Sequence, residues 1–358
     1  MKDSKMIKIN ENPNYGFNFP FSLVIPKVLN ENPSLVVACT LPRCFTDSSN
    51  SFDELIDKTM NDLGSVDPMH EHLSLENGNP MFIPCVPNIK EIRPGFLGKN
   101  VLYNNLQVDN NTFIKDVSKY YNLADQYKSM IEYAIEYLKS ENVFVDDKVI
   151  VSGYSEGAKF ASHFSLLHPE IIKCVVSGGT GGCISMPISE LDGYDLPYPI
   201  GISDLANFDM DSFRKINFFY YMGLSDKVDS AIPSFKTSYY LDEKGNKVEL
   251  VDECRNPIPP VDENGNPIFI MDSNGNYTAE FNLFSDNDVN TINKTLGTIT
   301  QDRFVKQFEI FKGLGLKCDF KMYPGNHINI FDNKDRLFKD VDNFIRETRN
   351  KNDQNLLK

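Results

Sequence analysis

Gly153-Tyr154-Ser155-Glu156-Gly157 is the stretch that decides the fold of this 358-residue chain. An apolar run over 148–151 precedes it and a helix-like segment over 158–167 follows it, which is the order strand, sharp turn, helix. Glycine on both sides of the serine leaves room for a strained turn that lifts the hydroxyl clear of the backbone. The pentapeptide alone would occur by chance in roughly one chain of this length in ten, so the flanking elements carry the inference. The stretch predicts a nucleophile elbow with Ser155 as the nucleophile.

Alternating strand and helix signals extend over most of the chain. Short apolar runs predict strands at 35–39, 81–86, 149–151, 171–177, 216–222 and 318–323. Apolar residues at three- and four-residue steps predict helices over 120–138 and 334–351. This pattern indicates an α/β fold with a mostly parallel central sheet and helices on both faces. We expect residues 1–230 and 301–358 to form this core.

Two segments depart from the alternation. Residues 182–211 are expected to form a lid-like segment, whose Tyr194, Tyr198 and Phe208 either line the substrate or pack in the fold. Residues 231–300 contain three turn signals of the Asn-Gly or Lys-Gly kind and predict a β-hairpin-rich insertion. The insertion either covers the pocket or mediates assembly into a homo-oligomer, and the sequence leaves both open. Two Asp-x-Asn-Gly-Asn runs lack the twelfth-position glutamate of a calcium loop, so hairpin turns are preferred.

Composition limits the partners and the compartment. Fifty Asp and Glu against 36 Lys and Arg give a formal net charge of −14, which repels nucleic acid and anionic membrane surfaces. The N-terminus lacks the apolar core of a signal peptide, and no run of about 18 apolar residues could span a bilayer. We expect a soluble, cytoplasmic protein with no nucleic-acid and no membrane partner. The seven cysteines lack framework spacing and are interpreted as buried free thiols.

A serine nucleophile needs a base, and five histidines are available. His327 follows the predicted strand at 318–323, where a loop can bring its imidazole to the edge of the sheet, and it is the candidate base. His163 and His168 lie on or just after the elbow's helix and are expected on the helix surface or at its C-terminal cap. His70 and His72 are expected in a solvated loop, and no metal site is predicted, because no further ligands accompany them.

The base needs a carboxylate to hold its tautomer. Asp226 follows the predicted strand at 216–222 and is the candidate acid, with Asp229 as the alternative. The chain order is then serine, aspartate, histidine, with the predicted insertion between the last two.

An oxyanion hole requires two backbone N–H donors. One is expected from Glu156, directly after the nucleophile, and the other from the loop after the strand at 35–39. In that loop Pro42 has no N–H, which leaves Thr40 or Leu41. Arg43 and Tyr154 are candidate substrate-binding residues; for Arg43 a structural ion pair is the alternative.

The chain resembles the α/β-hydrolases, whose triad follows the same order. More narrowly, Gly178-Gly179, Leu196-Pro197-Tyr198-Pro199-Ile200-Gly201, Gln301-Asp302-Arg303-Phe304 and Tyr323-Pro324-Gly325-Asn326-His327 resemble a group of uncharacterised bacterial serine hydrolases described only as esterases. The resemblance implies an α/β-hydrolase fold, a triad of Ser155, Asp226 and His327, acyl-enzyme cleavage of a small-molecule ester, and no cofactor. The chain departs from the group at Asn326, where a glycine is usual, and lacks the His-Gly or Gly-Gly-Gly oxyanion sequence of many esterases.

Three other functions stay open at this stage. A serine peptidase or amidase would use the same triad, and an acyltransferase would differ only in the nucleophile that deacylates the enzyme. A non-catalytic binding protein on a hydrolase scaffold is a third, which an intact set of serine, aspartate and histidine disfavours.

Overall fold

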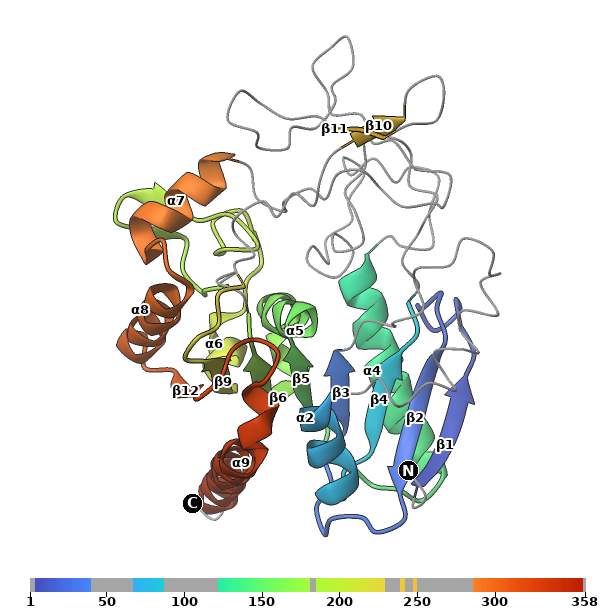
Figure 1. Cartoon of the computed structure of the whole chain (residues 1–358). Helices are drawn as coiled ribbons and strands as arrows, with labels where there is room; N and C mark the ends of the chain where they lie inside the picture. Colours follow the sequence, from blue (N-terminus) through green and yellow to red (C-terminus); the bar gives the residue numbers. More distant parts are fainter. Residues whose placement is uncertain are drawn as a thin grey trace.

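The computed structural model describes residues 4–39, 67–86, 122–180, 185–228, 239–241, 247–249 and 286–356 (Figure 1). In these ranges an eight-stranded sheet has the order β1-β2-β4-β3-β5-β6-β9-β12. The strands are β1 (Ser4–Ile9), β2 (Phe21–Pro26), β3 (Val36–Cys39), β4 (Met81–Pro84), β5 (Val149–Tyr154), β6 (Ile172–Gly178), β9 (Asn217–Gly223) and β12 (Lys317–Tyr323).

Strand directions complete the topology. β2 pairs antiparallel with both β1 and β4, whereas every pair from β4 to β12 across the sheet is parallel. A mostly parallel sheet with this order and one antiparallel strand second from its edge is the α/β-hydrolase fold. The carboxyl ends of the parallel strands meet at one edge, which is where such sheets carry their sites.

Helices cover both faces of the sheet because its parallel strands are apolar on both sides. The larger helices are α4 (Leu123–Ser140), α5 (Glu156–Leu167), α7 (Asp286–Leu296), α8 (Thr300–Gly313) and α9 (Lys334–Leu356), with the short α2 (Pro68–Glu71) and α6 (Met210–Phe213). Short π- and 3-10 segments lie at His72–Glu76, Pro169–Ile171 and Ile330–Asn333.

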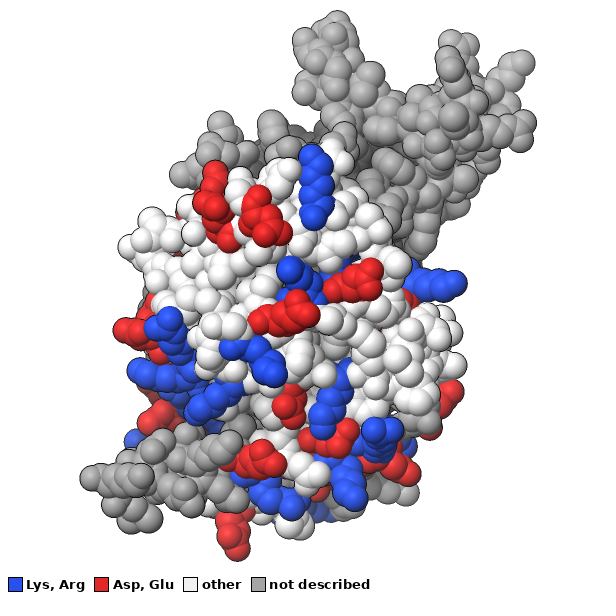
Figure 2. All heavy atoms as spheres, turned by 90° about the vertical axis from the view of Figure 1, so that its left-hand side faces the viewer, with Lys and Arg blue, Asp and Glu red and all other residues white. Residues whose placement is uncertain are grey.

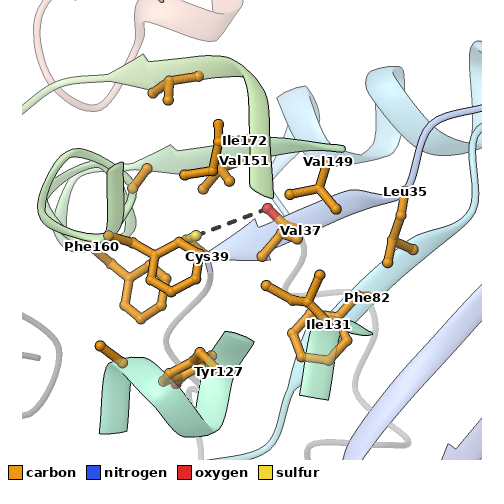
Figure 3. Close-up of a cluster of buried hydrophobic side chains, with 14 of the residues drawn as sticks. Leu35, Val37, Cys39, Phe82, Tyr127, Ile131, Val149, Val151, Phe160 and Ile172 are labelled. Carbon is orange, nitrogen blue, oxygen red and sulfur yellow. Dashed lines mark hydrogen bonds between the residues drawn. The ribbon is translucent and has the colours of Figure 1, made fainter. Parts of the chain in front are cut away.

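In β3 and β5, neighbouring side chains belong to two separate hydrophobic cores. Val37 and Val151 pack with α4, α5 and α8, whereas their neighbours Val36 and Ile150 pack with α2 and α9. Figure 3 shows the first core, in which Tyr127 of α4 and Phe160 of α5 lie 4.7 Å apart between ring centroids. The period-two alternation of a strand therefore decides which helices each residue contacts.

The six strands expected from apolar runs are all present, with boundaries shifted by at most a few residues. The helices expected over 120–138 and 334–351 correspond to α4 and α9. The expected mostly parallel α/β-hydrolase sheet is confirmed.

The interval 231–300 is described in part. An antiparallel hairpin of β10 (Tyr239–Leu241) and β11 (Lys247–Glu249) flanks the first predicted turn. Residues 286–296 are helical, however, as α7, which the turn signals did not predict. The other two predicted turns, at 262–266 and 272–276, lie outside the described residues.

The described part of the lid-like segment packs against the body of the fold. It contains an antiparallel hairpin of two short strands, β7 (Glu190–Leu191) and β8 (Tyr194–Asp195), each two residues long. Its Tyr198 and Phe208 are partly buried against the main core, while Tyr194 is exposed beneath the ammonium group of Lys294. Two of the three aromatic residues therefore have packing roles.

Other expectations concern thiols, charge and membrane spans. Cys39, Cys85 and Cys174 are buried free thiols, as expected, while Cys318 is half-buried.

On the face shown in Figure 2, acidic and basic side chains are interspersed. None of the helices in the described ranges has the length and apolarity needed to cross a bilayer.

Candidate active site

Ser155 lies in a strained turn between β5 and α5. Its backbone has φ 56° and ψ −116°, and its N–H donates to the carbonyl oxygen of Gly178 at 2.9 Å. A Cβ on Gly153 would lie 2.1 Å from the carbonyl oxygen of Gly157, and one on Gly157 would lie 1.8 Å from that of Cys39. Both glycines are therefore required by close backbone contacts, as the Gly-x-Ser-x-Gly pattern predicts. Glu156 is the first residue of α5, where helix N–H groups have no intrahelical partner.

His327 reaches the serine from the loop after β12. Its Nε2 lies 2.9 Å from Ser155 Oγ. The loop turns at Gly325, whose φ of +119° favours glycine, and a Cβ there would lie 2.8 Å from Asn329 Oδ1. The side-chain oxygen of Asn326 accepts hydrogen bonds from the backbone of Ile328 and Asn329. The position where glycine is usual in the resembling hydrolases thus carries a side chain that organises this turn.

Asp226 follows β9 and is 1% exposed. Its Oδ2 lies 2.9 Å from His327 Nδ1, and its Oδ1 accepts the backbone N–H of Val228 at 3.0 Å. An ionised carboxylate only accepts hydrogen bonds, so Nδ1 carries the imidazole proton and Nε2 can accept the proton of Ser155. The three residues expected to form a triad are joined in one chain of hydrogen bonds.

The acid and histidine loops are also joined through their backbones. Ser225 N–H donates to the carbonyl oxygen of Gly325 at 2.9 Å, and Leu224 N–H to that of Tyr323 at 2.8 Å. These bonds form because β9 and β12 are parallel neighbours whose carboxyl ends lie together. Thr300 and Gln301, at the start of α8, donate to the carbonyl oxygen of Asp226. The acid turn is therefore attached to the histidine loop and to α8.

The other predicted site residues have mixed outcomes. Tyr154 directs its hydroxyl to the carbonyl oxygen of His327, at 2.6 Å. Thr40, Leu41, Arg43 and Asp229 lie outside the described residues, and their roles stay predictions.

The expectations for three histidines are wrong. His70 and His72 are 0% and 6% exposed, rather than solvated, because α2 and the segment after it pack on the sheet. His163 is also fully buried, with its ring 5.6 Å from that of Tyr198, rather than on the helix surface. His168 directly follows α5, as expected, and contacts Asp125 and Glu170.

His70 forms a second imidazole–carboxylate pair, beneath the elbow. Its Nδ1 lies 2.9 Å from Asp67 Oδ2 and its Nε2 lies 2.7 Å from the carbonyl oxygen of Ser152. Burial opposes the charged ring, but the Asp67 carboxylate and the Ser152 carbonyl outweigh it and raise the pKa of His70. The Asp67-Pro68 start of a helix was a readable signal, since Asp caps helices and Pro favours their first turn.

Within the described ranges, no group of three or more histidine, cysteine or acidic side chains is arranged to hold a metal ion.

The strand order and the serine turn together define a protein with the α/β-hydrolase fold. No family model matches the chain, and no curated protein matches it in sequence.

Several solved structures are similar in chain path. One is a poly(3-hydroxybutyrate) depolymerase from Bordetella parapertussis, with 13% identity, 91% of this chain and 85% of that chain covered, and a TM-score of 0.48. Another is an S-formylglutathione hydrolase from Agrobacterium tumefaciens, with 12% identity, coverage of 96% and 95%, and a TM-score of 0.45. A third is poly(aspartic acid) hydrolase-1 from Sphingomonas sp. KT-1, with 12% identity, coverage of 92% and 94%, and a TM-score of 0.45. The fold assignment rests on the strand order and directions of this chain.

Proposed function

We propose that the protein is a serine hydrolase that cleaves small-molecule carboxylic esters through an acyl-enzyme, without a cofactor. The observation that carries the proposal is the hydrogen-bonded chain from Ser155 Oγ through His327 to Asp226, with both separations at 2.9 Å. These distances lie in the range that general-base activation of a serine requires. The strained backbone of Ser155 adds support, because strain of this kind occurs at functional turns.

In the proposed reaction, Ser155 Oγ attacks the ester carbonyl carbon while His327 Nε2 takes the hydroxyl proton. Asp226 stabilises the imidazolium that forms, since its carboxylate already accepts the Nδ1 proton. As the C–O bond breaks, His327 returns the proton to the departing alcohol. Water then attacks the acyl-enzyme with the same histidine as base, which releases the acid and restores Ser155.

The tetrahedral intermediate requires donors for its oxyanion. The N–H of Glu156 is the proposed first donor, because it lies at the N-terminus of the twelve-residue α5, where the helix dipole also favours negative charge. Thr40 or Leu41 is proposed as the second donor. Both residues follow Cys39, whose carbonyl oxygen lies beside Gly157 of the elbow. Arg43 is proposed to bind an anionic group of the substrate.

A fluorophosphonate probe and short p-nitrophenyl esters test the proposal. The wild-type protein should be labelled and should turn over the esters, whereas Ser155→Ala and His327→Ala should each lower turnover on the order of 10⁶-fold. Parallel assays with the matching anilides separate an esterase from an amidase, and product analysis with added alcohol detects acyl transfer.

Two matched variants serve as controls. Ser162→Ala removes a buried serine hydroxyl of α5 that bonds to the carbonyl oxygen of Ala158, and His168→Ala removes an imidazole beyond the end of the same helix. Both should keep labelling and turnover. A wild-type protein that is neither labelled nor active would contradict the proposal and favour a binding protein on a hydrolase scaffold.

A further inference from the structure

Tyr154 belongs to the strand that precedes Ser155 and contacts the loop that carries His327. It is the last residue of β5 and immediately precedes Ser155. Its ring centroid lies 5.1 Å from that of His327 and 5.0 Å from that of Phe331. A Cβ on Gly179 would lie 2.9 Å from the Tyr154 ring and 3.0 Å from His327 Cε1, so the two rings meet over a residue without a side chain.

The Tyr154 hydroxyl attaches the backbone of His327 to the nucleophile's strand. It donates to the carbonyl oxygen of His327 at 2.6 Å, a short hydrogen bond. Among the hydrogen bonds found for the described residues, this is the one that joins the His327 peptide to β5. The loop around it extends into solvent, since Ile328, the next residue, is 88% exposed. The Tyr154 bond adds a restraint on the His327 peptide to those that Ser225 and Asn326 place on the same loop.

We infer that Tyr154 is a positioning residue, which holds His327 at the distance that proton transfer from Ser155 requires. The inference rests on the proposed function. Because Tyr154 and Ser155 are adjacent, the tyrosine bond fixes the histidine backbone relative to the nucleophile, and the Asp226 bond fixes the ring. We assign Tyr154 this role in place of the predicted substrate binding, because its hydroxyl proton is already donated to the carbonyl oxygen of His327.

The hydroxyl remains a donor over the working pH range. Burial, reinforced by the nearby Asp226 and Asp67 carboxylates, raises the pKa of Tyr154 well above its usual value. The contact is therefore independent of pH under ordinary assay conditions.

Tyr154→Phe tests the inference because it keeps the ring and removes only the hydroxyl. We expect kcat on a p-nitrophenyl ester to fall about 10- to 100-fold, the effect of a displaced catalytic group, with KM unchanged. The matched control is Tyr220→Phe, which removes another buried tyrosine hydroxyl, 3.2 Å from Ser162 Oγ, in the core on the other face of the sheet. Tyr220→Phe should keep its kcat, and thermal unfolding verifies that both variants fold.

A second readout does not depend on turnover. In protein labelled with ¹⁵N-histidine, the bond to Asp226 protects the Nδ1 proton of His327 from exchange with solvent. The resonance of this proton is assigned by its disappearance in His327→Gln. The resonance should stay sharp in wild type and Tyr220→Phe, and should broaden or shift in Tyr154→Phe.

The outcomes separate the two proposals. An unchanged kcat and an unchanged resonance in Tyr154→Phe overturn the positioning role while leaving the hydrolase intact. A raised KM with an unchanged kcat also overturns it, in favour of substrate binding. If the wild-type protein cleaves no ester, the proposed function fails, and the resonance alone decides whether Tyr154 holds His327.

Discussion

Gly157 shows how closely single residues are constrained around Ser155. The carbonyl oxygen of Cys39, at the end of β3, occupies the space that a side chain on Gly157 would need. Neither partner can yield easily, because Cys39 pairs with Gly153 in the sheet and Gly157 lies in the first turn of α5. The contact also brings the end of β3 to the elbow, which is the arrangement that an oxyanion hole formed from both segments needs.

Gly157→Ala is therefore expected to lower the free energy of unfolding by about 1–3 kcal/mol, the usual cost of overpacking, or by more. Urea unfolding followed by circular dichroism measures the change. Gly313→Ala is the matched control: the glycine ends α8, and an added Cβ meets nothing within 4 Å. The control should be neutral or stabilise the protein by up to about 1 kcal/mol, because alanine favours helix. Equal unfolding curves for the two variants would contradict the steric argument.

At the residue scale, the candidate triad could be predicted because each member follows a strand signal. Ser155 directly follows β5, while Asp226 and His327 lie three and four residues after the ends of β9 and β12, and parallel strands bring such ends together. The role of Tyr154 could not be predicted in this way, since its partner is a backbone carbonyl 173 residues away. Nothing in a local pattern encodes that distance, and a position next to the nucleophile by itself favours a substrate-binding interpretation.

At the scale of elements, α2 shows how a four-residue helix can support the strand that precedes Ser155. Asp67 caps the helix by accepting the N–H groups of Met69 and His70, and its second oxygen lies against the His70 ring. The other ring nitrogen of His70 donates to Ser152 in β5. The Nε2 atom therefore carries a proton, and the Asp67 carboxylate beside Nδ1 favours the protonated ring and balances its positive charge, which raises the pKa of His70.

Asp67→Asn should remove this balance while keeping a side chain that can cap the helix. We expect the free energy of unfolding to fall by about 3 kcal/mol, the lower end for a broken buried pair, since the Asp67 side chain is 20% exposed. Urea unfolding near neutral pH measures the loss. Glu71→Gln, at an exposed acidic residue of the same helix, is the control and should change stability by no more than about 0.5 kcal/mol. A similar, small effect of both substitutions would exclude a supporting role for the pair.

The limits of sequence-based prediction at this scale are visible at the sheet's first edge. The apolar-run criterion finds six strands of the sheet but not β1, because Lys5 and Lys8 interrupt its apolar residues and much of the strand is exposed. It also omits β2, which is buried throughout but contains Ser22, follows Pro20 and ends at Pro26. Pairing across the sheet, rather than local composition, makes both segments strands.

At the scale of the whole molecule, His72 joins the C-terminal helix α9 to the segment that follows β3 in sequence. Its ring stacks on Phe338 with centroids 4.1 Å apart, and its Nε2 lies 2.9 Å from Asp342 Oδ1. Its Nδ1 lies 2.6 Å from Glu76 Oε2. Two carboxylates thus face the two ring nitrogens, so the contact is strongest when the imidazole is protonated.

The stability of this junction should depend on pH in a defined direction. Burial opposes protonation, but the bonds to Asp342 and Glu76 outweigh it and raise the pKa of His72. A raised folded-state pKa gives stability that is complete below the unfolded value of about 6.5 and is lost as the pH rises through the folded value. For Asp342 burial is likewise outweighed, by the bonds from His72 and Asn77, which lowers its pKa. Its contribution is complete above about pH 4 and is lost in more acidic solution.

The free energy of unfolding, measured in urea at about pH 5.5 and about pH 8.5, tests the junction in the full chain. The wild-type protein should lose more stability between these two values than His72→Gln, which cannot titrate. The comparison isolates His72, because the raised pKa of His70 contributes equally to both proteins. At the higher pH the two proteins should differ least, since the wild-type ring has then lost its charge. Parallel pH dependences would show that folding does not shift the pKa of His72, so that Asp342 and Glu76 do not stabilise its charged form, and that α9 is held by apolar packing against Phe219 and its neighbours instead.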